Sequence, residues 1–300
     1  MVRLLVGDGV VGFYSDRVLR VESTVPVYPR EPRGVAVVEV SEGIDVRDLR
    51  VLYEIVSRER GLRGFHLLYT AARLPSHAGI EVVDGEGLLV MVTLGHRPVA
   101  CARMRGAGYE PLTGTINVVV YTEEPLSRWA MLDLMRVAVE AKTAAVNELL
   151  PWCETRPFGT VTDAVAIARP EGPSYYATSG VLTRLGGLVA DAVESLVLRL
   201  WRSMLSPEER VAETLGPYAS SEIVERAAKN PGLLALLLAA RHLDLHVGHG
   251  SLPERLPTPE ALAEAARRLG EFREHEANHL ETLLRALGVG DEGLRGDGGG

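Results

Sequence analysis

The chain of 300 residues contains no glutamine, and only two of its 32 basic residues, Lys142 and Lys229, are lysine. Asparagine is also rare. Thermostable proteins avoid amide side chains and use many charged residues, so this composition favours a thermophilic source. The scarcity of lysine draws attention to Lys142, because an ammonium can lose its proton and act as a base or nucleophile, whereas a guanidinium stays charged. The alternative is that Lys142 is an ordinary surface lysine.

Long hydrophobic runs and export signals are lacking as well. The longest apolar stretch, residues 233–240, is too short to span a bilayer. The N-terminal MVRLLV has no signal-peptide core, so we expect a cytoplasmic protein. The chain has two cysteines, Cys101 and Cys153, without CxxC spacing. We expect them to be reduced core thiols, with a disulfide as the alternative.

Excess positive charge is absent too. The net charge is −8, and acidic and basic residues are interspersed along the chain. This pattern argues against binding to nucleic acid. Hydrophobic residues make up 46% of the sequence, which is enough to form a full core, and the length allows one large or two ordinary domains.

The hydrophobic pattern predicts the α+β class, with a domain of mixed α/β structure over residues 1–205. A helix over 126–150 lies between two β-branched runs, 114–122 and 159–168, which is typical of a strand–helix–strand crossover. The other strands should form an antiparallel meander, and a further helix should begin at Asp45 or Asp48 and end at Gly61. The other predicted strands are 3–6, 10–14, 17–22, 35–40, 65–71, 88–93 and 99–104.

After residue 183 the pattern becomes helical. We therefore predict an all-α domain over residues 206–287, followed by a disordered glycine-rich tail over 288–300. The predicted helices are 185–205, 207–215, 221–228, 232–247 and 259–287.

Polar residues gather in three segments of the first domain. GTIN at 114–117 opens a strand, EAKT at 140–143 lies within the long helix, and GTVTD at 159–163 opens the next strand. Alternation along a strand places Thr115 with Asn117 on one face, and Thr160 with Thr162 on one face. On the helix, Glu140 and Thr143 are neighbours, while Lys142 points away from Glu140.

These residue types suit acyl-transfer chemistry. A hydroxyl or a water attacks a carbonyl, a lysine or carboxylate takes the proton, and an amide or hydroxyl stabilises the oxyanion. The structural alternative is that threonines simply occupy strands and Asp163 caps a turn. The candidate catalytic residues are Asn117, Glu140, Lys142, Thr143, Thr160, Thr162 and Asp163.

The order and spacing of these segments, with ATSGVLTRLG at 177–186, resemble the adenosylcobinamide amidohydrolase family over roughly residues 60–200. The chain departs from the family pattern at three positions. Val161 stands where glycine is usual, Leu182 replaces a histidine and Arg184 replaces a lysine. The resemblance implies that the substrate-binding residues are Thr70, Thr93, Gly114, Thr115, Gly159, Thr183 and Arg184.

The resemblance implies hydrolysis of the amide between the corrin carboxyl and aminopropanol of adenosylcobinamide, releasing adenosylcobyric acid for cobamide salvage. Cobalt would arrive with the substrate, so the hydrolysis would need no cofactor. Lys142 or Asp163 would be the base, a threonine hydroxyl or water the nucleophile, and Asn117 the oxyanion donor. A competing hypothesis is a corrinoid-binding protein that has lost catalysis through the changes at Leu182 and Arg184. A homo-oligomer is compatible with either hypothesis.

The helical region has two further signals. His242, His246, His275 and His279 have helical spacing and are candidate ligands for a divalent metal, although the HExxH at 275–279 lacks a downstream ligand. Residues 208–238 faintly resemble the α-ribazole-phosphate phosphatase that is fused to some archaeal members of the family. The region would then bind α-ribazole phosphate; the alternative is a structural or dimerising domain.

Overall fold

The computed structural model describes residues 2–41, 48–83, 85–95, 97, 99–102, 115–153, 155–216, 219–230, 232–235 and 237–238. The chain divides into two compact units. The first comprises residues 1–100, 104–146 and 158–204, and the second comprises 101–103, 147–157 and 205–300. The predicted helix 259–287 and the glycine-rich tail lie outside the described residues, and the three-part domain division remains a prediction.

The first unit begins with a four-stranded sheet in the order β1 (Val2–Gly7), β2 (Val10–Ser15), β4 (Gly34–Glu39) and β5 (Phe65–Thr70). β4 and β5 are parallel, because α1 (Leu49–Glu59) connects them. The side chain of Asp48 accepts hydrogen bonds from the first amides of α1, as the capping prediction requires. Leu52 and Tyr53 of α1 pack on the outer face of this sheet.

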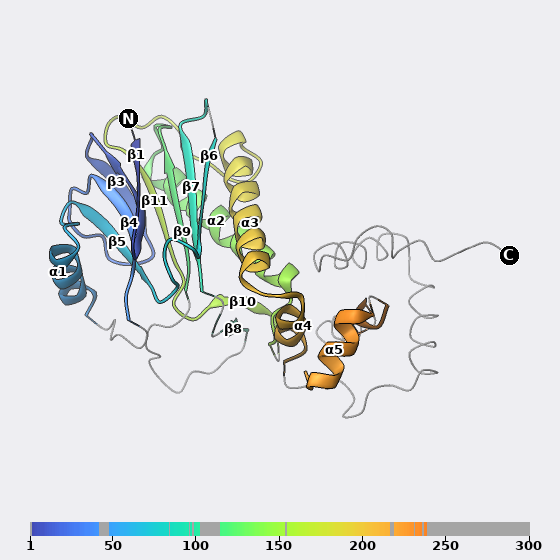
Figure 1. The fold of residues 1–300 in the computed structure, drawn as a ribbon. Coiled ribbons are helices and arrows are strands. Elements are labelled where there is room, and N and C mark those ends of the chain that lie inside the picture. Colours follow the sequence, from blue (N-terminus) through green and yellow to red (C-terminus); the bar gives the residue numbers. More distant parts are fainter. Residues whose placement is uncertain are drawn as a thin grey trace. The chain divides into compact units, whose positions relative to one another are not determined.

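A five-stranded sheet faces the first one, in the order β3 (Leu19–Ser23), β11 (Ala164–Pro170), β9 (Ile116–Thr122), β7 (Leu88–Leu94) and β6 (Ala78–Val83). β9 and β11 are parallel and joined by α2 (Arg128–Leu149), which confirms the predicted crossover. β6, β7 and β9 are antiparallel and form the meander. Helices α2 and α3 (Arg184–Met204) lie beside this sheet, so the layers run helix, sheet, sheet, helices (Figure 1). The mixed α+β class is therefore confirmed.

The main core fills the space between the two sheets. Phe13 and Val37 from the first sheet pack there against Met91, Val119 and Tyr121 from the second. Because side chains alternate along a strand, residues 117, 119 and 121 of β9 face the other sheet, and 116, 118 and 120 face the helices. Both faces are buried, which explains why β9 is rich in β-branched residues on both faces.

Two strand predictions needed correction. The predicted strand 159–168 is two strands, β10 (Pro157–Thr160) and β11, separated by a turn. β10 pairs with β8 (Val99–Cys101) in a two-stranded sheet. β6 was not predicted. Its Gly79 weakens the strand pattern, but a side chain there would collide with Leu196 of α3, since a Cβ would lie 2.7 Å from that side chain.

The second unit contains α4 (Pro207–Leu215) and α5 (Ser221–Lys229), which confirms two predicted helices. Ser206 and Glu209 form a capping box at the start of α4. Val211, Leu215, Ala227 and Leu238 are members of its small apolar core.

The expectation of reduced thiols was wrong, because Cys101 and Cys153 form a disulfide within the second unit. Their sequence spacing has no motif, but the fold brings their Cα atoms to 5.7 Å, within bonding range. Among the described helices, none is long and apolar enough to cross a membrane.

Candidate active site

The candidate site lies at the edge of the five-stranded sheet where β9 and β11 begin. Asn117 and Ala164 are register partners, so the residues just before each strand are neighbours. Thr115 precedes β9, and the turn ending in Asp163 precedes β11. β7 ends at the same edge, because its Leu94 pairs with Ile116. The crossover thus brings together the GTIN and GTVTD segments, which lie far apart in the sequence.

Asp163 is the centre of this cluster. Its Oδ2 forms an ion pair with Lys142 Nζ and accepts a hydrogen bond from the Thr160 amide at 3.1 Å. Its Oδ1 accepts hydrogen bonds from the Thr160 hydroxyl and from the Ile116 amide, the latter at 2.9 Å. The carboxylate is therefore fixed by donors from α2, β9 and β10.

Lys142 is buried, with only 8% of its side chain exposed, against 11% for Asp163. Its interpretation as a surface lysine is therefore wrong. Lys229 provides the contrast, because it is exposed on α5 and pairs with Glu225 one helical turn away. A buried charge needs a partner and hydrogen bonds, and Asp163 supplies the partner.

Gly159 provides the space for this ion pair. Its φ is +151°, and a Cβ at this position would lie 2.1 Å from Asp163 Oδ2 and 2.7 Å from Lys142 Nζ. Any side chain would therefore displace the pair. The expected role of Gly159 in binding substrate remains a prediction; what its position requires is the absence of a side chain.

Three further hydroxyl-bearing residues stabilise the segments around the pair. The hydroxyls of Thr115 and Thr162 are 2.9 Å apart and hydrogen-bonded. The hydroxyl of Thr143 donates to the carbonyl of Phe158 at 3.3 Å and so ties α2 to β10. These contacts hold the turn against the helix that carries Lys142.

Asn117 lies next to the cluster but points to the other face of the sheet. Its Nδ2 donates to the carbonyl of Tyr69 on β5 at 3.0 Å, and its buried Oδ1 has no hydrogen-bond partner among the described residues. In the same part of the chain, the buried hydroxyl of Thr93, its register partner on β7, also has none. The Thr70 hydroxyl accepts a hydrogen bond from the Ala72 amide at 3.0 Å. The Asn117 side chain therefore offers an unpartnered acceptor, Oδ1, while its Nδ2 binds Tyr69.

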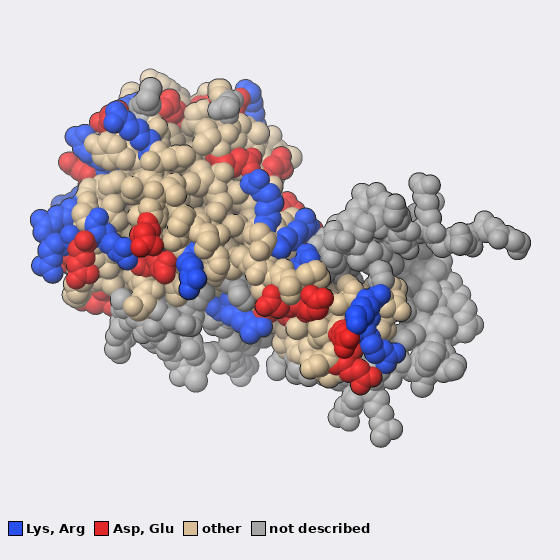
Figure 2. Space-filling view, in the orientation of Figure 1, with Lys and Arg blue, Asp and Glu red and all other residues tan. Residues whose placement is uncertain are grey.

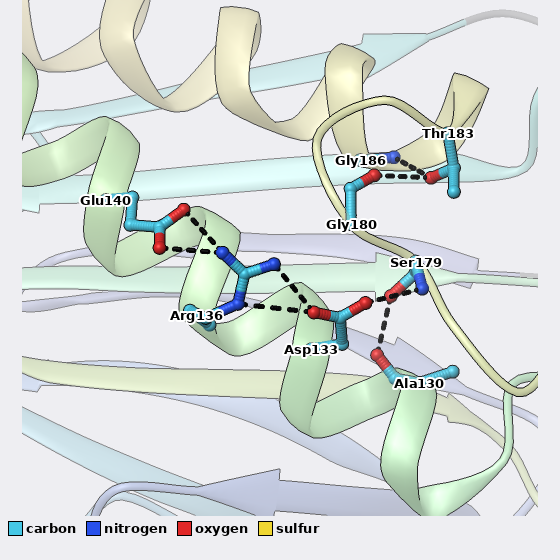
Figure 3. Close-up of polar contacts among 8 residues, drawn as sticks. All are labelled: Ala130, Asp133, Arg136, Glu140, Ser179, Gly180, Thr183 and Gly186. Atoms are coloured by element: carbon cyan, nitrogen blue, oxygen red, sulfur yellow. Dashed lines mark hydrogen bonds and ion pairs between the residues drawn. The ribbon is translucent and has the colours of Figure 1, made fainter.

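Glu140 does not join the cluster. It is exposed on α2 and accepts hydrogen bonds from Arg136 at 2.7 and 2.9 Å (Figure 3). Arg136 also binds Asp133 and holds the pKa of that carboxyl below its usual range. Asp133 in turn accepts a hydrogen bond from the Ser179 amide at 3.0 Å. This network fixes the loop before α3 to α2.

Thr183 and Arg184 are also remote from the cluster. The Thr183 hydroxyl donates to the Gly180 carbonyl at 2.8 Å and accepts from the Gly186 amide at 3.0 Å, which is how a helix N-cap binds (Figure 3). Arg184 pairs with Glu86, in the turn between β6 and β7. That turn lies at the other end of β7 from Leu94, roughly 20 Å away at the usual strand rise. Thr183 and Arg184, which the resemblance implied as substrate-binding residues, therefore lie at the opposite edge of the sheet from the cluster.

The remaining predicted residues, Gly114, His242, His246, His275 and His279, lie outside the described part of the chain. Within that part, no group of three or more histidine, cysteine, aspartate or glutamate side chains could hold a metal ion. On the face shown in Figure 2, the described acidic and basic side chains are interspersed, as the sequence predicted.

Sequence reasoning missed one residue at this edge, Glu39. It ends β4, is partly exposed, and accepts a hydrogen bond from the Leu74 amide at 2.7 Å through Oε2. Val35 and Val37 of the same strand face the core between the sheets, so alternation directs Glu39 into the same space. The available signal was a carboxylate at the end of an otherwise apolar strand.

A model of the family described as CbiZ, adenosylcobinamide amidohydrolase, matches residues 23–203 of this chain. The match begins at the end of β3 and stops near the end of α3, so it contains every residue of the Lys142–Asp163 cluster. No protein with a curated description matches the chain.

Proposed function

Because the chain belongs to the adenosylcobinamide amidohydrolase family, we propose that it hydrolyses adenosylcobinamide at the amide bond between the corrin carboxyl and aminopropanol. The products are adenosylcobyric acid and free aminopropanol, and the reaction serves cobamide salvage. The observation that supports this proposal best is the ion pair of the buried Lys142 with Asp163, whose carboxylate also binds the Thr160 hydroxyl and the Ile116 amide. Three separate segments of the matched region thus build this group together.

The arrangement favours Thr160 as the nucleophile. Its hydroxyl donates to Asp163 Oδ1, so the carboxylate is placed to take the proton as the oxygen attacks the amide carbon. The C–N bond then breaks, and the amine leaves with a proton while the corrin carboxyl is esterified to Thr160. A water hydrolyses this ester, which restores the threonine hydroxyl and gives the free acid.

Lys142 has two tasks in this scheme. Its ammonium orients Asp163 through Oδ2, and in this scheme it protonates the departing amine. Asp163 then returns the proton that it took from Thr160 to Lys142. The remaining candidates position these groups. Thr115 pairs with Thr162, Thr143 ties the helix to β10, and Asn117 anchors to Tyr69.

The test is direct incubation of the full chain with adenosylcobinamide. Mass spectrometry should detect adenosylcobyric acid and 1-amino-2-propanol, and a chelator should leave the rate unchanged because no protein metal takes part. Tight corrinoid binding without product would refute the proposal and favour the corrinoid-binding alternative.

The second activity stays a separate proposal. We infer from the sequence alone that an all-α domain over 206–287 removes phosphate from α-ribazole phosphate, with a divalent metal held by its histidines. That region lies outside the matched residues 23–203. Phosphate release by the full chain that disappears on truncation after residue 205 would support this activity. No release by the full chain would refute it.

A further inference from the structure

Polar side chains line the space between the two sheets at the edge that carries the Lys142–Asp163 cluster. Glu39 and Thr70 end adjacent parallel strands of the first sheet and are register partners. Thr93 and Asn117 are register partners in the second sheet. Core neighbours two residues earlier or later on each strand, such as Val37, face between the sheets, so all four side chains do. We call Glu39, Thr70, Thr93 and Asn117 the inter-sheet mouth.

The mouth presents hydrogen-bonding atoms that the described chain does not use. Asn117 Oδ1 and the Thr93 hydroxyl are fully buried and have no partner. Glu39 uses Oε2 to bind the Leu74 amide, and no hydrogen bond to its Oε1 is seen in the described residues. Buried polar groups normally find partners, so unpartnered acceptors at a functional edge indicate a ligand that supplies donors.

Among the four residues of the mouth, Glu39 is the charged one. His77 lies close enough for Glu39 to influence its pKa, but burial lowers that pKa, and the nearby Arg73 lowers it further. Arg73 is exposed and forms no ion pair with Glu39 in the part of the chain that is described. A ligand group entering the mouth therefore meets a carboxylate and an amide oxygen.

We propose that the inter-sheet mouth binds the amino-alcohol part of the substrate. Glu39 accepts a hydrogen bond from the nitrogen, as the amide N–H before cleavage and as the ammonium afterwards. Asn117 Oδ1 accepts from the alcohol hydroxyl, and the Thr93 hydroxyl donates to the alcohol oxygen. This assignment rests on the proposed hydrolysis and specifies which residues recognise the leaving group.

The position of the mouth suits this role. Asn117 follows Ile116, whose amide binds both Asp163 and Thr160. Lys142 lies on α2, which covers the face of the sheet that Ile116 and Val118 point to, whereas Asn117 points between the sheets. The mouth and Lys142 therefore lie on opposite faces of the first residues of β9. A scissile amide at this edge has its corrin carbonyl near Thr160 and its nitrogen directed between the sheets.

A structural role for Glu39 is the competing explanation, because its Oε2 binds the Leu74 amide. The Glu39→Gln variant separates the two roles. Glutamine keeps an oxygen for Leu74 but replaces the open carboxylate oxygen with an NH2 group, which cannot accept from an ammonium. Glu54→Gln, an exposed glutamate on α1, is the matched control.

The experiment measures inhibition of adenosylcobinamide hydrolysis by added 1-amino-2-propanol. We expect Glu39→Gln to weaken this inhibition about tenfold or more, since a hydrogen bond to a charged group is lost. Inhibition by adenosylcobyric acid should stay within about twofold, because that product does not enter the mouth. The Glu54→Gln control should behave as the wild type.

Thr93→Val provides a second and independent measurement. The wild type should be inhibited more strongly by 1-amino-2-propanol than by propylamine, which lacks the hydroxyl, and Thr93→Val should reduce this preference several-fold. Unchanged inhibition in Glu39→Gln together with an unchanged preference in Thr93→Val would overturn the assignment. Thermal melting of both variants confirms that they are folded.

Failure of the proposed hydrolysis gives a different result. If the wild type releases no product, calorimetric titration with 1-amino-2-propanol tests the mouth directly. Binding by the wild type that Glu39→Gln weakens about tenfold supports the site as an amino-alcohol site without the hydrolysis. Equal binding by both proteins, or none by the wild type, overturns it.

Discussion

Lys142 and Asp163 illustrate how a buried ion pair is made tolerable. Moving two charges out of water costs several kcal/mol per ion in real proteins, so the pair persists only when further hydrogen bonds satisfy it. Here the amides of Ile116 and Thr160 and the Thr160 hydroxyl complete the coordination of the carboxylate. A pair that is this costly to bury suggests a role in function rather than in stability.

Replacing Lys142 with arginine should abolish most activity although the charge is kept. The Lys142 ammonium lies so close to Gly159 that even a Cβ there would come within 2.7 Å of it, so we expect the larger guanidinium to be crowded; a guanidinium also cannot transfer a proton at neutral pH. We expect kcat/KM for adenosylcobinamide to fall at least about 100-fold, the usual contribution of a proton-transfer group. The control is Lys229→Arg, which changes the exposed lysine. Near wild-type turnover by Lys142→Arg would contradict both the packing and the proton-transfer argument.

Composition was enough to single out Lys142, but not to find its partner. Strand alternation was applied to residues 159–168, where a turn interrupts the strand, so the contacts of Asp163 were not predictable from that rule. The contact between Lys142 and Asp163 depends on how α2 crosses the sheet. Glu39 was not predicted because its neighbours at the site, such as Thr70 and Leu74, are distant from it in the sequence.

At the scale of elements, the turn between β10 and β11 depends on Gly159. Gly159→Ala should lower activity about 100-fold and destabilise the fold by about 1–3 kcal/mol, because the added Cβ meets the ion pair and the φ of +151° disfavours a side chain. Kinetics and urea unfolding measure the two effects. Gly64→Ala is the control, since no atom lies within 4 Å of its added Cβ. Equal behaviour of the two variants would refute this account of the turn.

The start of α3 provides a second test at this scale. Thr183→Ala removes an N-cap and should lower the free energy of unfolding by about 1 kcal/mol, with hydrolysis changed by less than about threefold. Ser203→Ala, in the same helix but not at a cap, is the comparison. If KM rises strongly while stability is unchanged, Thr183 binds substrate after all, as the family resemblance implied.

Most helices and strands could be predicted because their periodicities were strong. The apolar patterns of β9 and α2 indicated the parallel crossover, and the capping aspartate indicated the start of α1. The disulfide was not predictable, since only the folded chain brings Cys101 to Cys153. The placement of Thr183 and Arg184 was missed for a similar reason. The family segments follow one another along the sequence, and this order does not show at which end of the strands each segment lies.

For the whole molecule, stability should fall as the solution becomes mildly acidic. Burial lowers the pKa of His66 to about 4, and it also lowers the pKa of His77. At a pH between the lowered pKa of each buried histidine and its ordinary pKa of about 6.5, the unfolded chain binds protons that the folded protein excludes. The stabilisation is therefore complete above pH 6.5 and is lost as the pH falls.

His66 alone should reduce the free energy of unfolding by about 2 kcal/mol between pH 7.5 and pH 5. Urea unfolding at several pH values measures this slope. His66→Leu should flatten it, whatever its effect on stability at pH 7.5, because leucine does not titrate. An identical slope in the variant would show that the pKa of His66 is the same in the folded and unfolded chain, and would contradict the shift.

The first two residues of β9 contribute to two sites, the Lys142–Asp163 cluster and the inter-sheet mouth. The Ile116 amide anchors the reacting carboxylate on the helix side, and the Asn117 side chain lines the mouth on the other side. Deleting or inserting one residue between Thr115 and Val118 would therefore turn the side chains before or after the change to the opposite face of the sheet, and so would disturb both sites at once. A substitution in the GTIN segment therefore affects the site that its own side chain faces, whereas a change in the length of the segment affects both sites.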